Sequence, residues 1–229
     1  MDIWHIRGGN TLEGACFVQG SKNATLPIIA ASIISPARSE LMNVPQLRDV
    51  DAALRILRHL GCTAEQRQNE VFIDSTYLSG SSIPHSLMEE MRSSVIFMGA
   101  LLARCGEARL SLPGGCQLGK RPIDLHLSAL RKMGAQIEED GPEIYCRAER
   151  LRGAEIELPF PSVGATENIM LAACSARGRT VIRGAAREPE ISALQDYLAA
   201  MGAKISGAGS DTLTIEGFAA SGRAVCRII

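Results

Sequence analysis

The sequence predicts an α/β fold, of the α+β kind, in which one structural unit is used three times. Three segments, at residues 48–62, 121–135 and 187–203, read alike. Each has acidic residues in its first turn, apolar residues at helical spacing and a glycine where the helix should end, which is the pattern of an amphipathic surface helix. Because internal repeats constrain the whole architecture, this pattern is the main fold signal in the chain.

The elements around each surface helix also recur. A nearly all-apolar segment before it is expected to be a helix buried on all sides, and a short strand should link the two helices. After the surface helix, two strand-like segments flank a turn of Gly, Asn or Asp, which indicates a hairpin. The buried helices are expected at residues 24–34, 93–103 and 166–176, the short strands at 39–44, 108–112 and 179–183, and the hairpins at 63–74, 136–146 and 204–216.

Two regions fall outside this repeat. Residues 1–20 carry a β-hairpin pattern, with strand-like residues 3–7 and 15–19 around a Gly-Gly-Asn turn. Residues 218–229 end in a strand-like run from Arg223 with no turn after it. We therefore divide the chain into N-terminal strands, residues 1–20, and a three-repeat domain, residues 21–229.

Composition excludes several classes of protein. Lys and Arg number 24 against 25 Asp and Glu in 229 residues, and aromatic residues make up 4%. A protein that binds nucleic acid needs an excess of basic residues or aromatic side chains that stack on bases, so we expect no nucleic-acid partner. The longest apolar stretches, 26–34 and 95–103, are about half of the roughly 20 residues that a membrane helix needs. Seven scattered cysteines without a C-x-x-C pair are typical of a reducing compartment, so we expect a cytoplasmic protein.

One repeat carries an insertion that could hold chemistry. Residues 112–122 contain three Gly and two Pro, where the other repeats have only residues 45–47 and 184–186. Cys116 is the reactive side chain of this loop, and the basic residues that follow it favour a thiolate. This predicts a lid that carries a nucleophile or general acid. The alternative is a surface loop with an incidental cysteine.

The starts of the three buried helices form a second candidate site, because threefold pseudosymmetry brings equivalent ends together. They are residues 21–23, 91–94 and 162–166. Free N–H groups, Ser hydroxyls and the helix dipole suit phosphate, and Lys22 and Arg92 add positive charge. This predicts a phosphate-rich ligand. The alternative at each single start is ordinary N-capping.

Two further interpretations of the reactive residues are weaker. His126 and Cys116 would make a thiol hydrolase pair, but His126 lies in a surface helix and no orienting Asn is evident. Cys105, Cys116, His126 and Cys146 match no zinc-ligand spacing, so no metal site is predicted.

Six motifs, taken in order along the chain, resemble the UDP-N-acetylglucosamine 1-carboxyvinyltransferases, an enolpyruvyl transferase family. The motifs are residues 20–24, 91–94, 112–116, 119–126, 162–166 and 186–190. The resemblance implies an inside-out α/β barrel of three pseudo-symmetric βαβαββ units with buried helices. It also implies transfer of enolpyruvyl from phosphoenolpyruvate to the 3-hydroxyl of UDP-N-acetylglucosamine, the first committed step of peptidoglycan synthesis, with no cofactor.

The resemblance also implies a role for each matching residue. Cys116 matches the loop cysteine that protonates the phosphoenolpyruvate methylene and can form a thioether adduct. Lys22 matches a contact to the phosphoenolpyruvate phosphate, and Asn23 matches its neighbour, which also meets the sugar. The matches to UDP-N-acetylglucosamine contacts are Arg92, Arg121, Pro122, Ile123, Asp124, Leu125, Ser162, Val163 and Gly164. Among these, the stretch 121–125 would hold the uridine and residues 162–164 the diphosphate.

In that family a second, similar domain supplies a catalytic aspartate and further arginines and packs with the opening strands. Family proteins are nearly twice this length, so this chain is expected to hold the Cys loop and the nucleotide-sugar half of the site and to be inactive alone. Phe160 departs from the lysine that many members have, which would weaken diphosphate binding. The alternatives are a non-catalytic nucleotide-sugar binding module and the shikimate-pathway enolpyruvyl transferase, which shares the fold.

Overall fold

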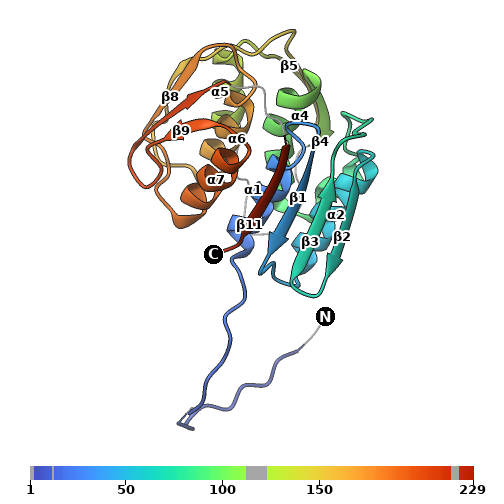
Figure 1. The fold of residues 1–229 in the computed structure, drawn as a ribbon, viewed down its shortest axis with the longest axis vertical. Coiled ribbons are helices and arrows are strands. Elements are labelled where there is room, and N and C mark those ends of the chain that lie inside the picture. The colour runs from blue at the N-terminus through green and yellow to red at the C-terminus, as the bar shows by residue number, and fades with distance from the viewer. Residues whose placement is uncertain (1–2, 12, 112–122, 218–221) are drawn as a thin grey trace.

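The computed structural model describes residues 3–11, 13–111, 123–217 and 222–229, and its elements follow the three repeats (Figure 1). The first repeat contains α1 (Lys22–Ala31), β1 (Ala37–Met42), α2 (Arg48–His59), β2 (Thr63–Arg67) and β3 (Glu70–Asp74). The second contains α3 (His85–Glu90), the 3-10 helix η1 (Arg92–Ile96), α4 (Phe97–Cys105), β4 (Glu107–Ser111), α5 (Asp124–Lys132), β5 (Gln136–Asp140) and β6 (Glu143–Arg147). The third contains β7 (Glu155–Glu157), α6 (Val163–Ala173), β8 (Arg179–Arg183), α7 (Pro189–Ala200), β9 (Lys204–Ser206) and β10 (Thr212–Glu216), and β11 (Gly222–Arg227) follows it.

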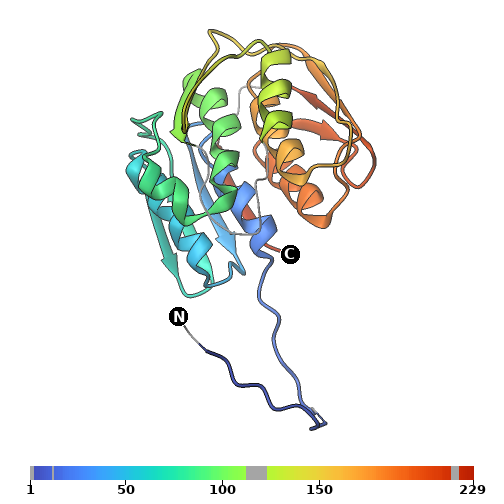
Figure 2. The same ribbon diagram turned by 180° about the vertical axis from the view of Figure 1, so that it is seen from behind.

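The sheets confirm the α/β fold and its repeat. In each repeat the strand between the two helices pairs antiparallel with the second strand of the hairpin. That second strand also pairs antiparallel with the first strand of the same hairpin. The resulting orders are β1-β3-β2, β4-β6-β5 and β8-β10-β9. The sheets of the first and third repeats lie on opposite sides of the molecule, with α1 and α6 between them (Figures 1 and 2).

The three apolar helices are buried, as their composition predicts. All described residues of α1 from Ala24 to Ala31 are buried, and so are those of α6 from Ala165 to Ala173. Helix α4 packs against α6 so closely that the N–H of Gly99 donates to the side-chain oxygen of Asn168 at 2.6 Å. The centre of the molecule is therefore built from helices.

In each repeat the strand between the two helices also has a parallel partner. In the third repeat β7 pairs with β8, and in the second a parallel bridge joins Ser82 to Arg109. In the first repeat the partner of β1 is β11, from the other end of the sequence. The expectation that residues 218–229 fall outside the repeat is therefore wrong for β11. A parallel partner can come from far along the chain, so local pattern does not reveal it.

The predicted N-terminal hairpin is also wrong. The described residues among 3–19 form no strand and are exposed. They run away from the body of the molecule as an extended segment (Figure 1). Its large apolar side chains, Ile3, Trp4, Ile6, Phe17 and Val18, are between 79% and 104% exposed. A two-stranded hairpin without a packing partner is at best marginally stable, which accounts for the difference.

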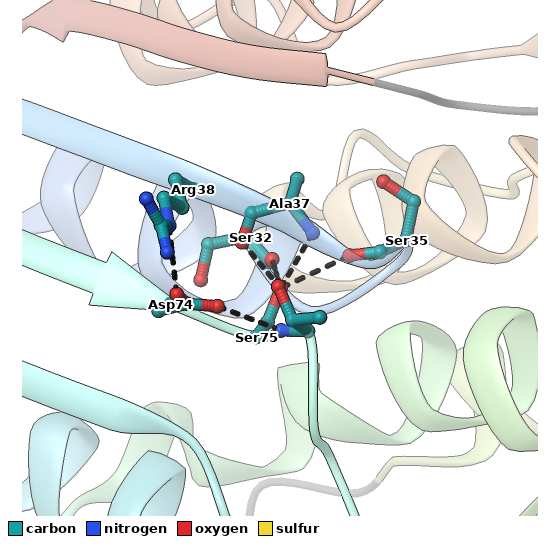
Figure 3. A network of polar contacts seen from close by, with 7 residues as sticks. Ser32, Ser35, Ala37, Arg38, Asp74 and Ser75 are labelled. Atoms are coloured by element: carbon teal, nitrogen blue, oxygen red, sulfur yellow. Dashed lines mark hydrogen bonds and ion pairs between the residues drawn. The ribbon is translucent and has the colours of Figure 1, made fainter.

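A buried hydroxyl joins the segment after α1 to the start of β1 (Figure 3). The Ser75 Oγ atom lies 2.7, 3.0 and 3.1 Å from the carbonyl oxygens of Ser32, Ser35 and Ala37, and it accepts from the N–H of Ala37 at 3.3 Å. One side chain thus satisfies polar backbone groups where the chain turns inside the core.

Among the described helices none is long and apolar enough to cross a membrane.

Candidate functional site

The starts of α1, η1 and α6 surround one cavity of about 410 Å³. The three equivalent helix starts therefore lie together, as the pseudosymmetry predicts. Six residues of the expected site line this cavity: Asn23, Arg92, Ile123, Ser162, Val163 and Gly164. His126 and Glu167 line it as well, and the sequence did not mark either as a ligand contact.

At the start of α1, the cavity is lined by Asn23 and not by Lys22. Ser21 caps the helix, because its hydroxyl accepts from the N–H of Ala24 at 3.3 Å. The Lys22 ammonium instead contacts Asp49 Oδ2 at 2.8 Å, with side-chain exposures of 44% and 32%. Such a surface ion pair contributes about 0–1 kcal/mol, so a phosphate could displace Asp49 at little cost.

The start of α6 offers free hydrogen-bond donors. Ser162 caps the helix, since its hydroxyl accepts from the N–H of Ala165 at 3.4 Å. The N–H groups of Val163 and Gly164 come before the first residue that can donate within the helix, and no described group accepts from them. These donors line the cavity at the positive end of the helix dipole, which suits an anion.

Arg92 supplies positive charge to the cavity wall from the start of η1, where it is half-buried. Within the described part of the chain no carboxylate forms an ion pair with Arg92. Its guanidinium therefore remains available to a ligand.

The stretch before and into α5 is only partly described. Ile123 lines the cavity, Asp124 is the exposed first residue of α5, and the partly buried Leu125 packs against the core. The predicted site residues Cys116, Arg121 and Pro122 lie outside the described residues.

His126 differs from its expected setting. It is only 7% exposed, and its Nδ1 atom lies 2.8 Å from the amide nitrogen of Asn168 on α6. The expectation of a surface position with no orienting Asn is therefore wrong. Burial lowers the pKa of His126 to about 4, against a smaller opposing effect of the Asp124 carboxylate, so the ring is neutral near pH 7. The signal that could have revealed Asn168 is an amide inside an all-apolar helix.

Glu167 is a buried acid at the same cavity. It is 7% exposed, and none of the described residues donates a hydrogen bond to it. Burial raises the pKa of Glu167 well above its usual value, and the neighbouring carboxylates of Glu190 and Glu188 raise it further. Glu167 is not predicted from the sequence as a site residue, because its segment has the composition of an ordinary buried helix.

Both alternative chemistries include Cys116, which lies outside the described residues, so only their other members can be placed. No group of three His, Cys, Asp or Glu side chains among the described residues could hold a metal ion. Cys146 is buried, and burial raises the pKa of its thiol to about 12, so it remains protonated. The Nδ1 atom of His126 contacts Asn168, so this ring could meet a thiol only through Nε2. The groups that suit a ligand at the cavity wall are the N–H donors of Val163 and Gly164 and the guanidinium of Arg92, which together can bind an anion.

Comparison with known sequences gives a consistent family match. Residues 6–229 match the family model described as EPSP synthase (3-phosphoshikimate 1-carboxyvinyltransferase). The chain is similar to UDP-N-acetylglucosamine 1-carboxyvinyltransferase 2 of Caldanaerobacter subterraneus subsp. tengcongensis, with 51% identity over 95% of this chain and 52% of that protein. It is 48% identical to the UDP-N-acetylglucosamine 1-carboxyvinyltransferase of Oleidesulfovibrio alaskensis over 95% and 52% of the two chains. The chain thus spans about half the length of the curated relatives it matches.

Solved structures show the same fold. The enolpyruvyl transferase NikO from Streptomyces tendae superposes with a TM-score of 0.86 at 22% identity, over 97% of this chain and 53% of that one. The EPSP synthase of Acinetobacter baumannii gives a TM-score of 0.76 at 23% identity, over 94% and 49%. These neighbours confirm the fold of the three-repeat unit.

Proposed function

The chain belongs to the EPSP synthase family of carboxyvinyltransferases, and from this premise we propose that it forms one half of an enzyme that transfers enolpyruvyl from phosphoenolpyruvate to the 3-hydroxyl of UDP-N-acetylglucosamine. This reaction would place it in peptidoglycan synthesis, and hence in cell wall growth and division. The observation that carries the proposal is the cavity where three helix starts meet, because its free N–H groups and Arg92 suit a diphosphate.

The choice of acceptor substrate rests on sequence similarity. The relatives at 46–51% identity are named for UDP-N-acetylglucosamine, whereas the EPSP synthase structures are 22–23% identical. We therefore favour the nucleotide sugar over shikimate 3-phosphate. In this assignment Ser162, Val163 and Gly164 receive the diphosphate through the N-terminal N–H groups of α6, and Arg92 contacts the same ligand.

The uridine would be held by the segment that leads into α5. Asp124 would accept a hydrogen bond from the uracil N–H, and Arg121 would neutralise phosphate. Pro122, Ile123 and Leu125 would shape the surrounding wall. Ile123 already lines the cavity, so the uridine would lie near this edge.

The phosphoenolpyruvate would lie beside the start of α1. Lys22 would leave Asp49 and contact the phosphate, and Asn23 would meet both phosphoenolpyruvate and the sugar. Cys116 would deliver a proton to the methylene carbon, and the 3-hydroxyl would attack the adjacent carbon as it gives its own proton to a base. Loss of phosphate and of a proton from the new methyl group would then restore the double bond. Attack of the Cys116 thiolate at the carbon that the 3-hydroxyl attacks gives the thioether adduct. None of these steps requires a cofactor from this chain.

A catalytic base and further arginines are expected from a second enolpyruvyl transferase domain, because the relatives are about twice as long as their matched part. The opening residues 1–20 would pack with that domain. Transition-state stabilisation needs donors from both sides of a closed site, and loss of one donor alone costs roughly 10²- to 10³-fold. The chain by itself is therefore expected to bind but to turn over very slowly. We expect it in the cytoplasm, where its free cysteines would stay reduced.

Calorimetric titration of the chain with UDP-N-acetylglucosamine, with shikimate 3-phosphate as the matched alternative, tests the proposal. We expect binding of the nucleotide sugar only, weakened at least tenfold in Arg92→Ala. Preference for shikimate 3-phosphate would favour the shikimate-pathway reaction, and binding of neither would contradict the proposal. An epoxide analogue of phosphoenolpyruvate should then label Cys116, whereas a non-catalytic binding module has no need of an activated thiol.

A further inference from the structure

Two backbone groups fix the orientation of the Asn168 amide. Its Oδ1 atom accepts from the N–H of Gly99 at 2.6 Å, and its Nδ2 atom donates to the carbonyl oxygen of Val95 at 3.0 Å. Turning the amide over would bring donor against donor and acceptor against acceptor. Because the site is buried, water could not replace either hydrogen bond, so only one orientation is stable.

This orientation decides which nitrogen of His126 carries the proton. The Asn168 Nδ2 atom lies 2.8 Å from Nδ1 of His126, and an amide nitrogen can only donate. The Nδ1 atom must therefore accept through its lone pair. In a neutral imidazole the proton then sits on Nε2. The depressed pKa of His126 agrees with this neutral form.

The protonated edge of the ring faces the cavity. A Cβ atom built on Gly164 would lie 3.2 Å from Cε1 and 3.5 Å from Nε2 of His126, so this edge points at the start of α6. Among the described residues, the fully buried side-chain polar atoms without a hydrogen-bond partner are Ser35 Oγ and Thr180 Oγ1. The unpartnered Nε2 atom is not one of these, so it is reached from the cavity that His126 lines, on the side where Gly164 lies.

We propose that His126 binds the ligand by donating a hydrogen bond from Nε2–H to an anionic oxygen at the start of α6, and that Asn168 is the positioning residue that holds His126 in this tautomer. The inference rests on the proposed function, in which that oxygen belongs to the diphosphate of UDP-N-acetylglucosamine. A neutral donor fixed in this way gives the same hydrogen bond at any pH from about 5 to 8, unlike a histidine that titrates in that range.

Nitrogen-15 NMR of the labelled chain without ligand tests the role of Asn168. We expect the His126 ring to show an unprotonated Nδ1 and a protonated Nε2 across pH 5–8, with the signals assigned by their loss in His126→Gln. In Asn168→Asp the new carboxylate can only accept, so Nδ1 should become protonated. A ring of the parent chain that carries its proton on Nδ1, or that titrates near pH 6.5, would overturn the assignment.

Two substitutions of His126 separate ligand contact from packing. Asn can replace the Nδ1 acceptor but has nothing at the place of Nε2, whereas Gln reaches the place of Nε2 but leaves Nδ2 of Asn168 without its acceptor. We therefore expect His126→Asn to keep most of the stability and to bind UDP-N-acetylglucosamine roughly ten- to a hundredfold more weakly, the effect of losing one hydrogen bond to a charged group. His126→Gln should bind within about threefold of the parent chain but unfold at lower denaturant concentration.

The outcomes distinguish this inference from the proposed function. If the parent chain binds the nucleotide sugar and His126→Asn binds equally well, the ligand contact is wrong while the proposed function stands. If the parent chain does not bind, the proposed function fails and takes the ligand contact with it. The NMR tautomer then still decides the role of Asn168.

Discussion

The backbone N–H of Ser21 donates to the carbonyl oxygen of Ile229 at 2.6 Å. Close by, the side chain of Asn43 donates to the carbonyl oxygen of Ile228 at 3.0 Å, and the N–H of Ile228 donates to Met42 at 2.9 Å. These bonds attach the residues after β11 to the first repeat. The strand β11 itself forms the edge of the first repeat's sheet, next to β1. The first repeat therefore depends on a segment that is remote in sequence.

The first prediction compares the two ends of the chain. Removal of residues 222–229 deletes a paired strand and the buried Ile228 side chain, so the free energy of unfolding should fall by more than about 3 kcal/mol. Ile228→Ala is a milder version and should cost about 2–5 kcal/mol. Removal of residues 1–19, whose described part is exposed, should change stability by less than about 0.5 kcal/mol. Urea unfolding followed by circular dichroism measures all three. Equal losses from both ends would contradict the structure.

The same region shows what the sequence could and could not predict. The helices and antiparallel strands follow from periodicity and turn residues over short stretches, and the structure has them within a few residues of the expected bounds. The pairing of β11 with β1 depends on three-dimensional closure of the repeat. Equally, a strand-like composition in residues 3–7 does not show whether a neighbouring surface exists to hold a strand.

The second prediction concerns the contact between α4 and α6 at Gly99. A Cβ atom at Gly99 would lie 2.3 Å from the backbone oxygen of Asn168 and 2.7 Å from its Oδ1. Gly99→Ala should therefore push the helices apart and destabilise the chain by about 2–4 kcal/mol, although Ala favours a helix by about 1 kcal/mol. Gly80→Ala is the control, because its Cβ would find ordinary contacts from 3.7 Å outward. Thermal unfolding measures both variants. Equal unfolding temperatures for Gly99→Ala and Gly80→Ala would show that α4 and α6 are not this close.

The third prediction concerns the hydroxyl of Ser75 (Figure 3). Its oxygen contacts the carbonyl oxygens of Ser32, Ser35 and Ala37 together. Ser75→Ala leaves these buried groups with fewer partners and should cost about 1–3 kcal/mol in the free energy of unfolding. Ser128→Ala, on the exposed face of α5, serves as the control and should change stability by less than about 0.5 kcal/mol. An unchanged denaturation midpoint in Ser75→Ala would mean that water enters this turn.

The candidate site was predictable only in part, for a physical reason. Serines, a lysine and an arginine at helix starts can be recognised by residue type and spacing, and Asn23, Arg92 and Gly164 do line the cavity. The contribution of His126 depends on which way its ring faces and on an amide 42 positions away in the sequence. Lys22 is a further case, since its ion pair with Asp49 is set by packing of α1 against α2.

The last prediction uses the pH dependence of stability to test the buried acid Glu167. Burial raises its pKa in the folded chain well above the ordinary value of 4.5, so folding favours the protonated form. As pH rises above about 4.5, the unfolded chain ionises at this residue while the folded chain does not, and the free energy of unfolding falls. The loss is about 1.4 kcal/mol for each pH unit until pH passes the folded pKa. Glu167→Gln removes this titration, so it should be near the parent chain in stability at pH 4.5 and more stable than it at higher pH, with a difference that grows until pH passes the folded pKa. Replacing Glu190, whose charge raises the pKa of Glu167, should shift the fall in stability so that it ends at a lower pH.

Urea unfolding of each variant at each pH measures these differences in the free energy of unfolding. A constant difference between Glu167→Gln and the parent chain from pH 4.5 to 8 would mean that Glu167 ionises normally, with water or a cation at the cavity to stabilise its charge.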